Sequence, residues 1–235
     1  MGSIVSYTLE GGVATIAMDD GKVNAMSLRM QAELNEALDR AEADRATVLL
    51  AGRKGVFSAG FDLPVLGAGG EPALKMLSGG FELARRLLSF PTPVVVACTG
   101  HALAMGVFLV ASADYRVGAE GAFKIGANEV AIGMILPRAA IEVCKARLAP
   151  AHYGRALINA EIYAPADAVA AGFLDRVVAE EQVLAEAQAM AARLSKLMMK
   201  AHLATKLLAR EQLLKDLDAA MLADRETYKA MMGVK

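Results

Sequence analysis

One glutamate is the residue of this sequence best placed to transfer protons. Glu129 stands between the segment 123–128 and the apolar run Val130–Met134. If these apolar neighbours bury the side chain, the anionic form is disfavoured and the pKa of the carboxyl rises toward that of a working base. The alternative interpretation is an ordinary glutamate that is hydrogen-bonded or exposed at the surface.

Two loops of small residues could supply the complementary electrostatics. Ala59 and Gly60 stand at the end of a predicted strand, where small side chains let a ligand approach backbone N–H groups closely. Met105 and Gly106 precede an apolar helix whose dipole favours negative charge. Two such N–H groups converging on one oxygen would form an oxyanion hole.

Other catalytic and metal-binding signatures are absent from the sequence. It contains no nucleophile elbow, P-loop, dinucleotide fingerprint or pair of histidines at metal-ligand spacing. The histidines His101, His152 and His202 therefore have structural or solvated roles in this interpretation. Cys98 and Cys144 lie far apart and match no metal-ligand spacing. We expect no metal site, and free thiols in a protein of cytoplasmic type.

Composition sets further limits. The chain has 235 residues, 55% of them hydrophobic and 22% charged, which fits one α/β domain with a small appendage and excludes disorder. Its 25 Lys and Arg against 26 Asp and Glu provide no basic field for nucleic acid. The uncharged stretch Val94–Ala113 is the membrane candidate, but Thr99 and His101 interrupt it. We interpret it as a buried strand, a turn and a buried helix, and expect a soluble protein without membrane contact.

Hydrophobic periodicity predicts strands alternating with helices, followed by a helical region. Alternation over 4–9 and 13–18 predicts a hairpin, and Ser27 is expected to cap a helix. A pattern of strand, turn, helix and strand recurs through residues 45–135, which is typical of parallel strands with right-handed crossovers. The other predicted elements are strands at Thr47–Ala51 and Val94–Cys98, a helix at Pro72–Ser89, and helices at Arg138–Leu148, Glu180–Leu208 and Glu211–Met231.

The sequence resembles the crotonase superfamily, that is, enoyl-CoA hydratases and isomerases, over essentially the whole chain. The motifs that carry the resemblance are Lys22–Met26, Phe57–Leu63, Gly100–Ala102, Ala104–Gly106, Asp114–Arg116 and Glu129–Gly133. The resemblance implies an α/β fold, a crotonase-like spiral of β-β-α repeats over residues 1–180. A C-terminal helical region, 181–235, would close the pocket and form a homotrimer or a dimer of trimers.

The resemblance also implies roles for individual residues. The N–H groups of Ala59 and Met105 would bind the carbonyl oxygen of an acyl-CoA thioester. Coenzyme A would enter as part of the substrate, with no separate cofactor. Its predicted contacts are Lys22, Val23, Ala25, Ala59, Gly60, Phe61, Asp62 and Leu63.

Two positions depart from the hydratase pattern. Hydratases of this superfamily use two glutamates, and the position of the first is Phe108 here, which can neither hold water nor transfer a proton. The second aligns with Glu129, in a run similar to the corresponding motif of mitochondrial-type Δ3,Δ2-enoyl-CoA isomerases. Met105 stands where glycine is frequent, and a required positive φ would strain methionine.

These features predict an isomerase that moves the double bond of a 3-enoyl-CoA to the 2-position, with Glu129 as its single base. An apolar cavity including Phe81, Phe108 and Met134 would hold the acyl chain and exclude water. Three alternatives stay open at this point. They are an enoyl-CoA hydratase, a non-catalytic acyl-CoA binding protein, and a mostly structural oligomer held by its C-terminal helices.

Overall fold

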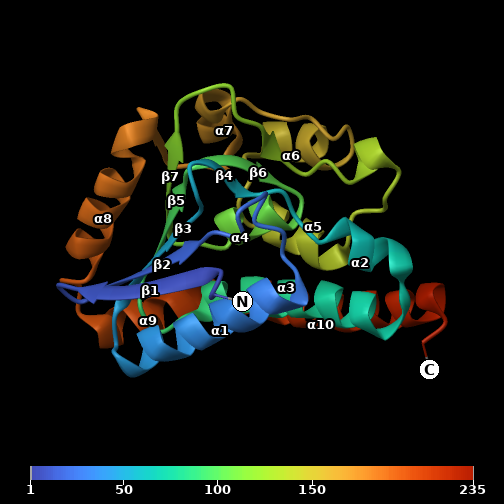
Figure 1. The fold of residues 1–235 in the computed structure, drawn as a ribbon, viewed down its shortest axis with the longest axis horizontal. Helices are drawn as coiled ribbons and strands as arrows, with labels where there is room; N and C mark the ends of the chain where they lie inside the picture. Colours follow the sequence, from blue (N-terminus) through green and yellow to red (C-terminus); the bar gives the residue numbers. More distant parts are fainter. Residues whose placement is uncertain (1, 235) are drawn as a thin grey trace.

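The chain forms two β-sheets surrounded by helices, and the computed structural model describes residues 2–234 (Figure 1). The larger sheet has the order β1-β2-β3-β5-β7-β9, and the smaller has the order β4-β6-β8. The strands are β1 (Val5–Glu10), β2 (Val13–Met18), β3 (Thr47–Ala51), β4 (Gly55–Ser58), β5 (Val94–Cys98), β6 (Gly100–Leu103), β7 (Tyr115–Ala119), β8 (Ile125–Gly126) and β9 (Arg176–Val178).

Successive turns of the chain place one strand in each sheet, which makes the fold a spiral. β3, β5 and β7 pair in parallel in the large sheet, and each is followed by β4, β6 or β8 in the small one. The hairpin of β1 and β2 is antiparallel, as its alternating pattern predicts. The expected α/β spiral is therefore confirmed. Within Val94–Ala113 the strand and the helix are found, but Gly100–Leu103 forms the strand β6 where a turn was expected, because it pairs in parallel with β4 and β8.

Helices cover both faces of the large sheet (Figure 1). On β3, Leu49 and Ala51 pack with α8 on one face, whereas Val48 and Leu50 face the core that contains α1, α3 and α4. The helices are α1 (Leu28–Ala43), α2 (Leu63–Ala68), α3 (Gly70–Ser89), α4 (Met105–Ala111), α5 (Arg138–Lys145), α6 (Pro150–Leu157), α7 (Pro165–Ala171), α8 (Val183–Leu194), α9 (Met199–Ala209) and α10 (Glu211–Met232), with 3₁₀ turns η1 (Val130–Ile132) and η2 (Glu180–Gln182). No helix in the described part of the chain is long and apolar enough to cross a membrane.

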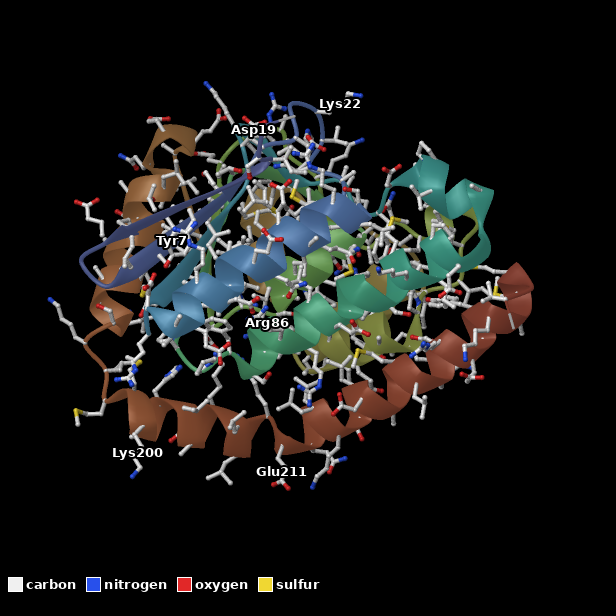
Figure 2. The ribbon with its side chains drawn as sticks, turned by 60° about the horizontal axis from the view of Figure 1, so that its bottom comes forward. Tyr7, Asp19, Lys22, Arg86, Lys200 and Glu211 are labelled. Carbon is white, nitrogen blue, oxygen red and sulfur yellow. The ribbon has the colours of Figure 1, made fainter. Side chains whose placement is uncertain are left out.

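The C-terminal region differs from the sequence prediction. The helix expected over 180–208 is broken, because α8 ends at Leu194 and α9 begins at Met199. α8 lies on the sheet through Val183, Ala187 and Ala191, whereas α9 turns away along the bottom of the molecule (Figures 1 and 2). One straight helix over residues 180–208 could not lie on the sheet and also run along the bottom of the molecule. The predicted helix 138–148 is also shorter, ending at Lys145.

A buried lysine fastens α9 to the rest of the molecule. The Nζ atom of Lys206 donates to the carbonyl oxygens of Phe90 and Thr92, at 3.0 and 3.2 Å, and to the Asp114 carboxylate at 2.7 Å. Arg210 pairs with the other oxygen of the same carboxylate at 2.9 Å. Two carbonyl acceptors and a carboxylate counter-ion compensate the desolvation of the Lys206 ammonium, whose side chain is 3% exposed.

Lys206→Met should therefore destabilise the protein by about 3 kcal/mol, because it leaves Asp114 and two carbonyl groups without their main donor. Chemical denaturation measures this loss. The matched control is Lys200→Met on the same helix, where the side chain projects into solvent (Figure 2) and should cost little. Equal effects of the two substitutions would contradict the assigned role of Lys206.

Candidate active site

The predicted site residues lie at one end of the small sheet. Its three strands are parallel, so their C-terminal ends meet at the same edge. Loop 59–62 follows β4, Met105 begins the helix after β6, and Glu129 follows β8. The spiral thus brings together three segments that are separated by more than 20 residues along the chain.

Glycines let two of these segments touch through their backbones. Gly60 has φ of 99°, and a Cβ built there would lie 2.7 Å from the Ala104 Cβ and 3.4 Å from the Met105 nitrogen. A Cβ at Gly106 would lie 2.4 Å from the carbonyl oxygen of Ser58. Any larger residue at either position would push the loop and the start of α4 apart.

The hydrogen-bond pattern bears on which amides can bind a ligand oxygen. The Ala59 N–H, expected to be a donor to the thioester, instead donates to the carbonyl oxygen of Val23 at 3.0 Å. Within the described residues, the N–H of Phe61 on the same loop has no acceptor. Met105 is the first residue of α4, so its N–H has no partner within the helix. Within the described residues, the amides of Phe61 and Met105 are therefore both unengaged and could bind a ligand oxygen.

Backbone strain falls on Ala104 and not on Met105. Met105 adopts helical geometry at the start of α4, whereas Ala104 before it has φ of 49° and ψ of −128°. This region suits glycine, and a residue with a Cβ held there costs on the order of 1–3 kcal/mol. The strain expected at the methionine is thus carried by its neighbour, and it leaves the Met105 amide at the helix N-terminus.

A network of polar contacts fixes the loop predicted to hold coenzyme A. The Asp20 carboxylate accepts hydrogen bonds from the N–H groups of Lys22, Asn24 and Ala25, at 2.7 to 3.0 Å. The buried Asn24 side chain donates to the carbonyl oxygens of Met18 and Phe57 at 3.0 and 3.1 Å. These bonds hold loop 19–26 against the end of β4. Sequence reasoning missed Asp20 and Asn24, although Asp and Asn in a polar loop are a known signal for such turns.

Apolar side chains in loop 19–26 and directly after loop 59–62 face solvent. Val23 is 50% exposed and Leu63 is 62% exposed. Lys22 is exposed on the same loop (Figure 2). Of the predicted coenzyme A contacts, Lys22, Val23, Ala59 and Leu63 are therefore accessible from outside. Gly60 is buried, and its carbonyl oxygen accepts from the Met26 N–H at 2.8 Å.

Glu129 is buried, and its carboxyl has no counter-ion among residues 2–234. The residue is 5% exposed, and its Oε2 atom has no hydrogen-bond partner. Burial raises the pKa of Glu129 to about 7, and its own backbone N–H offsets this only partly. Val130 and Ile132, the neighbours expected to cover it, are themselves 44% and 53% exposed. Tertiary contacts therefore bury the carboxyl. Its negative charge helps to raise the pKa of Cys144 on α5 and of Tyr228 on α10, although burial is the larger cause at both.

The predicted acyl pocket is partly assembled. Phe81 and Phe108 stack with ring centroids 6.0 Å apart, and both are almost fully buried. Phe61 meets Phe81 edge-on at 6.4 Å. Met134 is half-buried, and its N–H donates to the Glu129 carbonyl oxygen at 2.9 Å. Phe108 thus fills its space with an aromatic ring and provides no group that could hold a water molecule.

No cluster of His, Cys, Asp or Glu among residues 2–234 has the geometry of a metal site. His101 accepts a hydrogen bond from the Lys124 N–H at 3.0 Å, and His152 lies 3.4 Å from the Tyr163 hydroxyl. The strand ends of the small sheet thus carry one carboxyl with a pKa near neutrality and two unengaged backbone donors.

Comparisons with known proteins agree with this geometry. The family model described as enoyl-CoA hydratase/isomerase matches residues 8–234. A solved structure of an enoyl-CoA hydratase/isomerase family protein from Pseudomonas syringae is 49% identical, with a TM-score of 0.93, and the match covers 95% of this chain and 97% of that one.

Curated relatives carry two kinds of name. Human mitochondrial enoyl-CoA delta isomerase 1 is 34% identical over 178 residues, which are 73% of this chain and 59% of the human protein. The match thus spans less than two thirds of that relative. A probable enoyl-CoA hydratase from Mycobacterium avium is 30% identical over 78% of this chain and 72% of its own length.

Replacing Ala104 by glycine tests the strain at the start of α4. Ala104→Gly should raise the free energy of unfolding by about 1 kcal/mol, because relief of the positive φ exceeds the added flexibility of the unfolded chain. Denaturant titration measures the change. Ala111→Gly, within the same helix, should instead destabilise, and a loss of stability in both variants would contradict the assigned strain.

The raised pKa of Glu129 makes stability depend on pH. Above its ordinary value of 4.5 the unfolded state loses the proton, while the folded state keeps it until about pH 7, so stability falls as the pH rises through this window. Glu129→Gln removes the charge. The increase in the free energy of unfolding that this substitution gives over the natural protein should be about 2 to 3 kcal/mol larger at pH 8 than at pH 5. A gain independent of pH, measured by paired denaturation curves, would contradict the raised pKa.

Proposed function

Because this chain belongs to the enoyl-CoA hydratase/isomerase family, we propose that it moves the double bond of a 3-enoyl-CoA thioester to the 2-position. One observation carries the proposal. Of the two buried carboxyl side chains among the described residues, Asp224 binds amides of α5, whereas Glu129 has an oxygen without a partner. Glu129 is therefore free to exchange a proton with a substrate.

A single carboxyl suffices for both proton transfers. Glu129 takes a proton from C2, and the electron pair of that C–H bond moves into the thioester group to form a dienolate. The N–H groups of Phe61 and Met105 donate to its oxygen, each contributing about 3 kcal/mol of transition-state stabilisation. When the carbonyl re-forms, C2 and C3 become doubly bonded and C4 takes the proton back from Glu129.

The site resists addition of water for two reasons. Phe108 occupies the position at which family hydratases carry their first glutamate, and its ring packs on Phe81. Glu129 can deprotonate a substrate carbon by itself. Adding water by the two-glutamate route would need a second carboxylate to orient the water molecule, and Phe108 takes that position. A hydratase is the second candidate, and the name of the Mycobacterium avium relative favours it.

Backbone groups of the two fixed loops would hold coenzyme A. In this proposal the exposed side chains of Val23 and Leu63 contact coenzyme A. The amide of Phe61, in place of that of Ala59, donates to the thioester oxygen. The other proposed contacts are Lys22, Ala25, Gly60 and Asp62.

Turnover of trans-3-hexenoyl-CoA to the 2-enoyl product tests the function. Glu129→Gln should lower kcat by at least about 100-fold, since it removes the general base. The kcat/KM of the natural protein should rise with pH and reach half its maximum near pH 7, because the base acts in its ionised form.

Glu181→Gln, an exposed glutamate of η2, serves as control and should keep full activity. Rapid hydration of crotonyl-CoA without isomerisation would replace the isomerase by the hydratase. Binding of both thioesters without turnover would favour a non-catalytic acyl-CoA binding protein.

A further inference from the structure

A chain of hydrogen bonds joins a buried glutamine of α1 to loop 59–62. The Gln31 residue is 5% exposed, and its Nε2 atom donates to the carbonyl oxygens of Met26 and Met76, at 3.0 and 2.8 Å. The N–H of Met26 in turn donates to the carbonyl oxygen of Gly60 at 2.8 Å. One side-chain amide thus ties α1 and α3 to the loop that carries a proposed oxyanion donor.

The last bond of this chain sets the direction of the Phe61 N–H. The carbonyl group of Gly60 and the N–H of Phe61 belong to the same trans peptide, so they lie in one plane and point in opposite directions. Holding the carbonyl oxygen against Met26 therefore aims the N–H away from Met26. Accepting a hydrogen bond also polarises the peptide, which makes its N–H a stronger donor.

Gly79 of α3 provides the space for the Gln31 amide. A Cβ built at Gly79 would lie 2.4 Å from the Oε1 atom of Gln31, which is shorter than a real Cβ contact. Glycine is less favourable than alanine inside a helix, and Gly79 lies in the middle of α3. The close approach of Gln31 is the physical reason for a glycine at this position.

The next residue of α3 makes room for the proposed donor segments themselves. A Cβ at Gly80 would lie 2.6 Å from the Phe61 ring and 3.3 Å from the sulfur of Met105. α3 therefore contacts both segments whose N–H groups are unengaged, and it accepts a hydrogen bond from Gln31 one turn earlier, at Met76. The positions of α3, Gln31 and loop 59–62 are thus mutually dependent.

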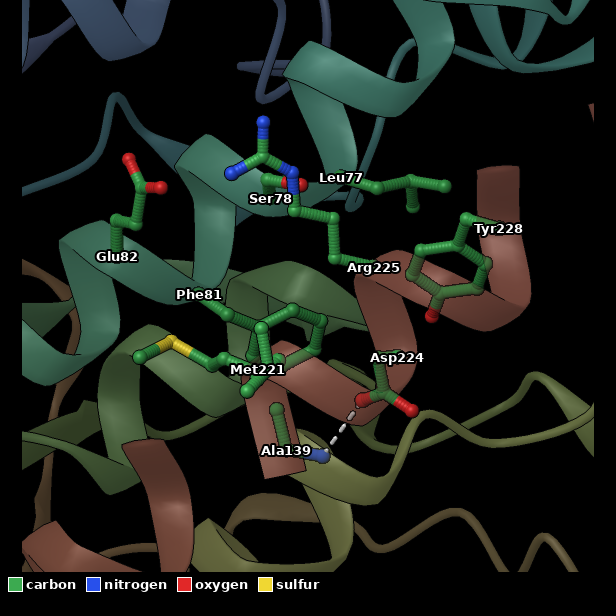
Figure 3. Close-up of a pocket in the computed structure, with 10 residues that line it drawn as sticks. Leu77, Ser78, Phe81, Glu82, Ala139, Met221, Asp224, Arg225 and Tyr228 are labelled. Carbon is green, nitrogen blue, oxygen red and sulfur yellow. Dashed lines mark hydrogen bonds between the residues drawn. The ribbon is translucent and has the colours of Figure 1, made fainter. Parts of the chain in front are cut away.

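α3 is supported on another side by the C-terminal helix α10. Phe81 of α3 and Met221 of α10 line a cavity of about 190 Å³ beside the two helices (Figure 3). The charged residues Glu82 and Arg225 also line it, and we assign it no ligand. The Phe81 ring meets the Phe61 ring edge-on at 6.4 Å. α3 therefore lies between α10 and loop 59–62, and its placement limits that of the loop.

We propose that Gln31 is a positioning residue of the oxyanion hole, which acts through Met26 to aim the N–H of Phe61 at the thioester oxygen. This inference rests on the proposed function, in which that N–H stabilises the dienolate. Gln31 itself does not touch the substrate in this arrangement. Without its amide, the Met26 carbonyl loses this donor, and the Gly60–Phe61 peptide is held less firmly.

Gln31→Met tests the proposal, because it keeps the length of the side chain and removes both N–H groups. For trans-3-hexenoyl-CoA, kcat should fall about 10- to 100-fold. KM should change less than about threefold, since the oxygen carries its full charge only in the transition state. A kcat within about twofold of that of the natural protein would overturn the proposal.

Asn35→Leu is the matched control on α1. It also replaces an amide by an apolar side chain, and it removes the hydrogen bond that Asn35 accepts from Arg86 at 2.9 Å, but it leaves Met26 untouched. This variant should lose stability and keep the kcat of the natural protein. Thermal melting verifies that each variant is folded. Equal losses of kcat in Asn35→Leu and Gln31→Met would show a purely structural role for Gln31.

Gly79→Ala tests the same contact from α3. Its methyl group meets Oε1 of Gln31 and displaces the amide, so kcat should fall. Gln31→Ala opens this space, and adding Gly79→Ala to it should therefore lower kcat no further than Gln31→Ala alone. Losses that multiply in the double variant would contradict an action of both residues through one contact.

Infrared spectroscopy of bound hexanoyl-CoA, isotope-labelled at its thioester carbonyl, reports on the oxyanion hole without turnover. Hydrogen bonds to a carbonyl lower its stretching frequency. The frequency at saturation should therefore be higher in Gln31→Met than in the natural protein, and Asn35→Leu should match the natural protein. An unchanged frequency in Gln31→Met would overturn the proposal.

The saturated ligand also separates this inference from the proposed function. If no 3-enoyl-CoA is isomerised but the carbonyl frequency still depends on Gln31, the isomerase fails and the positioning role stands. If isomerisation depends on Glu129 but neither kcat nor the frequency responds to Gln31→Met, only the inference about Gln31 fails.

Discussion

The backbone contact between the Gly60 loop and the start of α4 is the constraint on which the site depends. It brings two chain segments so close that neither Gly60 nor Gly106 has room for a side chain. Parallel pairing of β4, β6 and β8 sets this approach, since it aligns the strand ends from which the segments emerge. The strained φ of Ala104 is the local cost of turning β6 directly into α4.

Burial of Glu129 links this geometry to chemistry. A carboxyl that alternately takes and returns a proton works best when its pKa is close to the working pH. Desolvation supplies that shift here, and the backbone N–H of Glu129 opposes it only in part. The same desolvation destabilises the ionised form, so the protein gives up stability at high pH in order to keep a base near neutrality.

The C-terminal helices complete the structure around the site through a few polar anchors. Lys206 fixes α9 beside Asp114, and Asp224 of α10 caps the N-terminus of α5. These anchors determine where the apolar face of α10 lies, and with it the cavity beside Phe81. The helices that follow the spiral therefore bound one side of α3.

Local patterns in the sequence determined the elements and pointed to the chemical groups. Alternation predicted the hairpin, Ser27 predicted the start of α1, and Glu129 was identified as the one glutamate in an apolar setting. Each depends on residues near in sequence, where spacing and propensity carry the information.

Only the tertiary structure decided which amides are free, what buries Glu129 and where the C-terminal helices bend. The Ala59 N–H is engaged by Val23, 36 residues earlier in the chain, so the available donor on that loop is Phe61. Glu129 is buried although its neighbour Val130 is exposed, because distant segments cover it. Such contacts join residues far apart in sequence, and a local pattern contains no record of them.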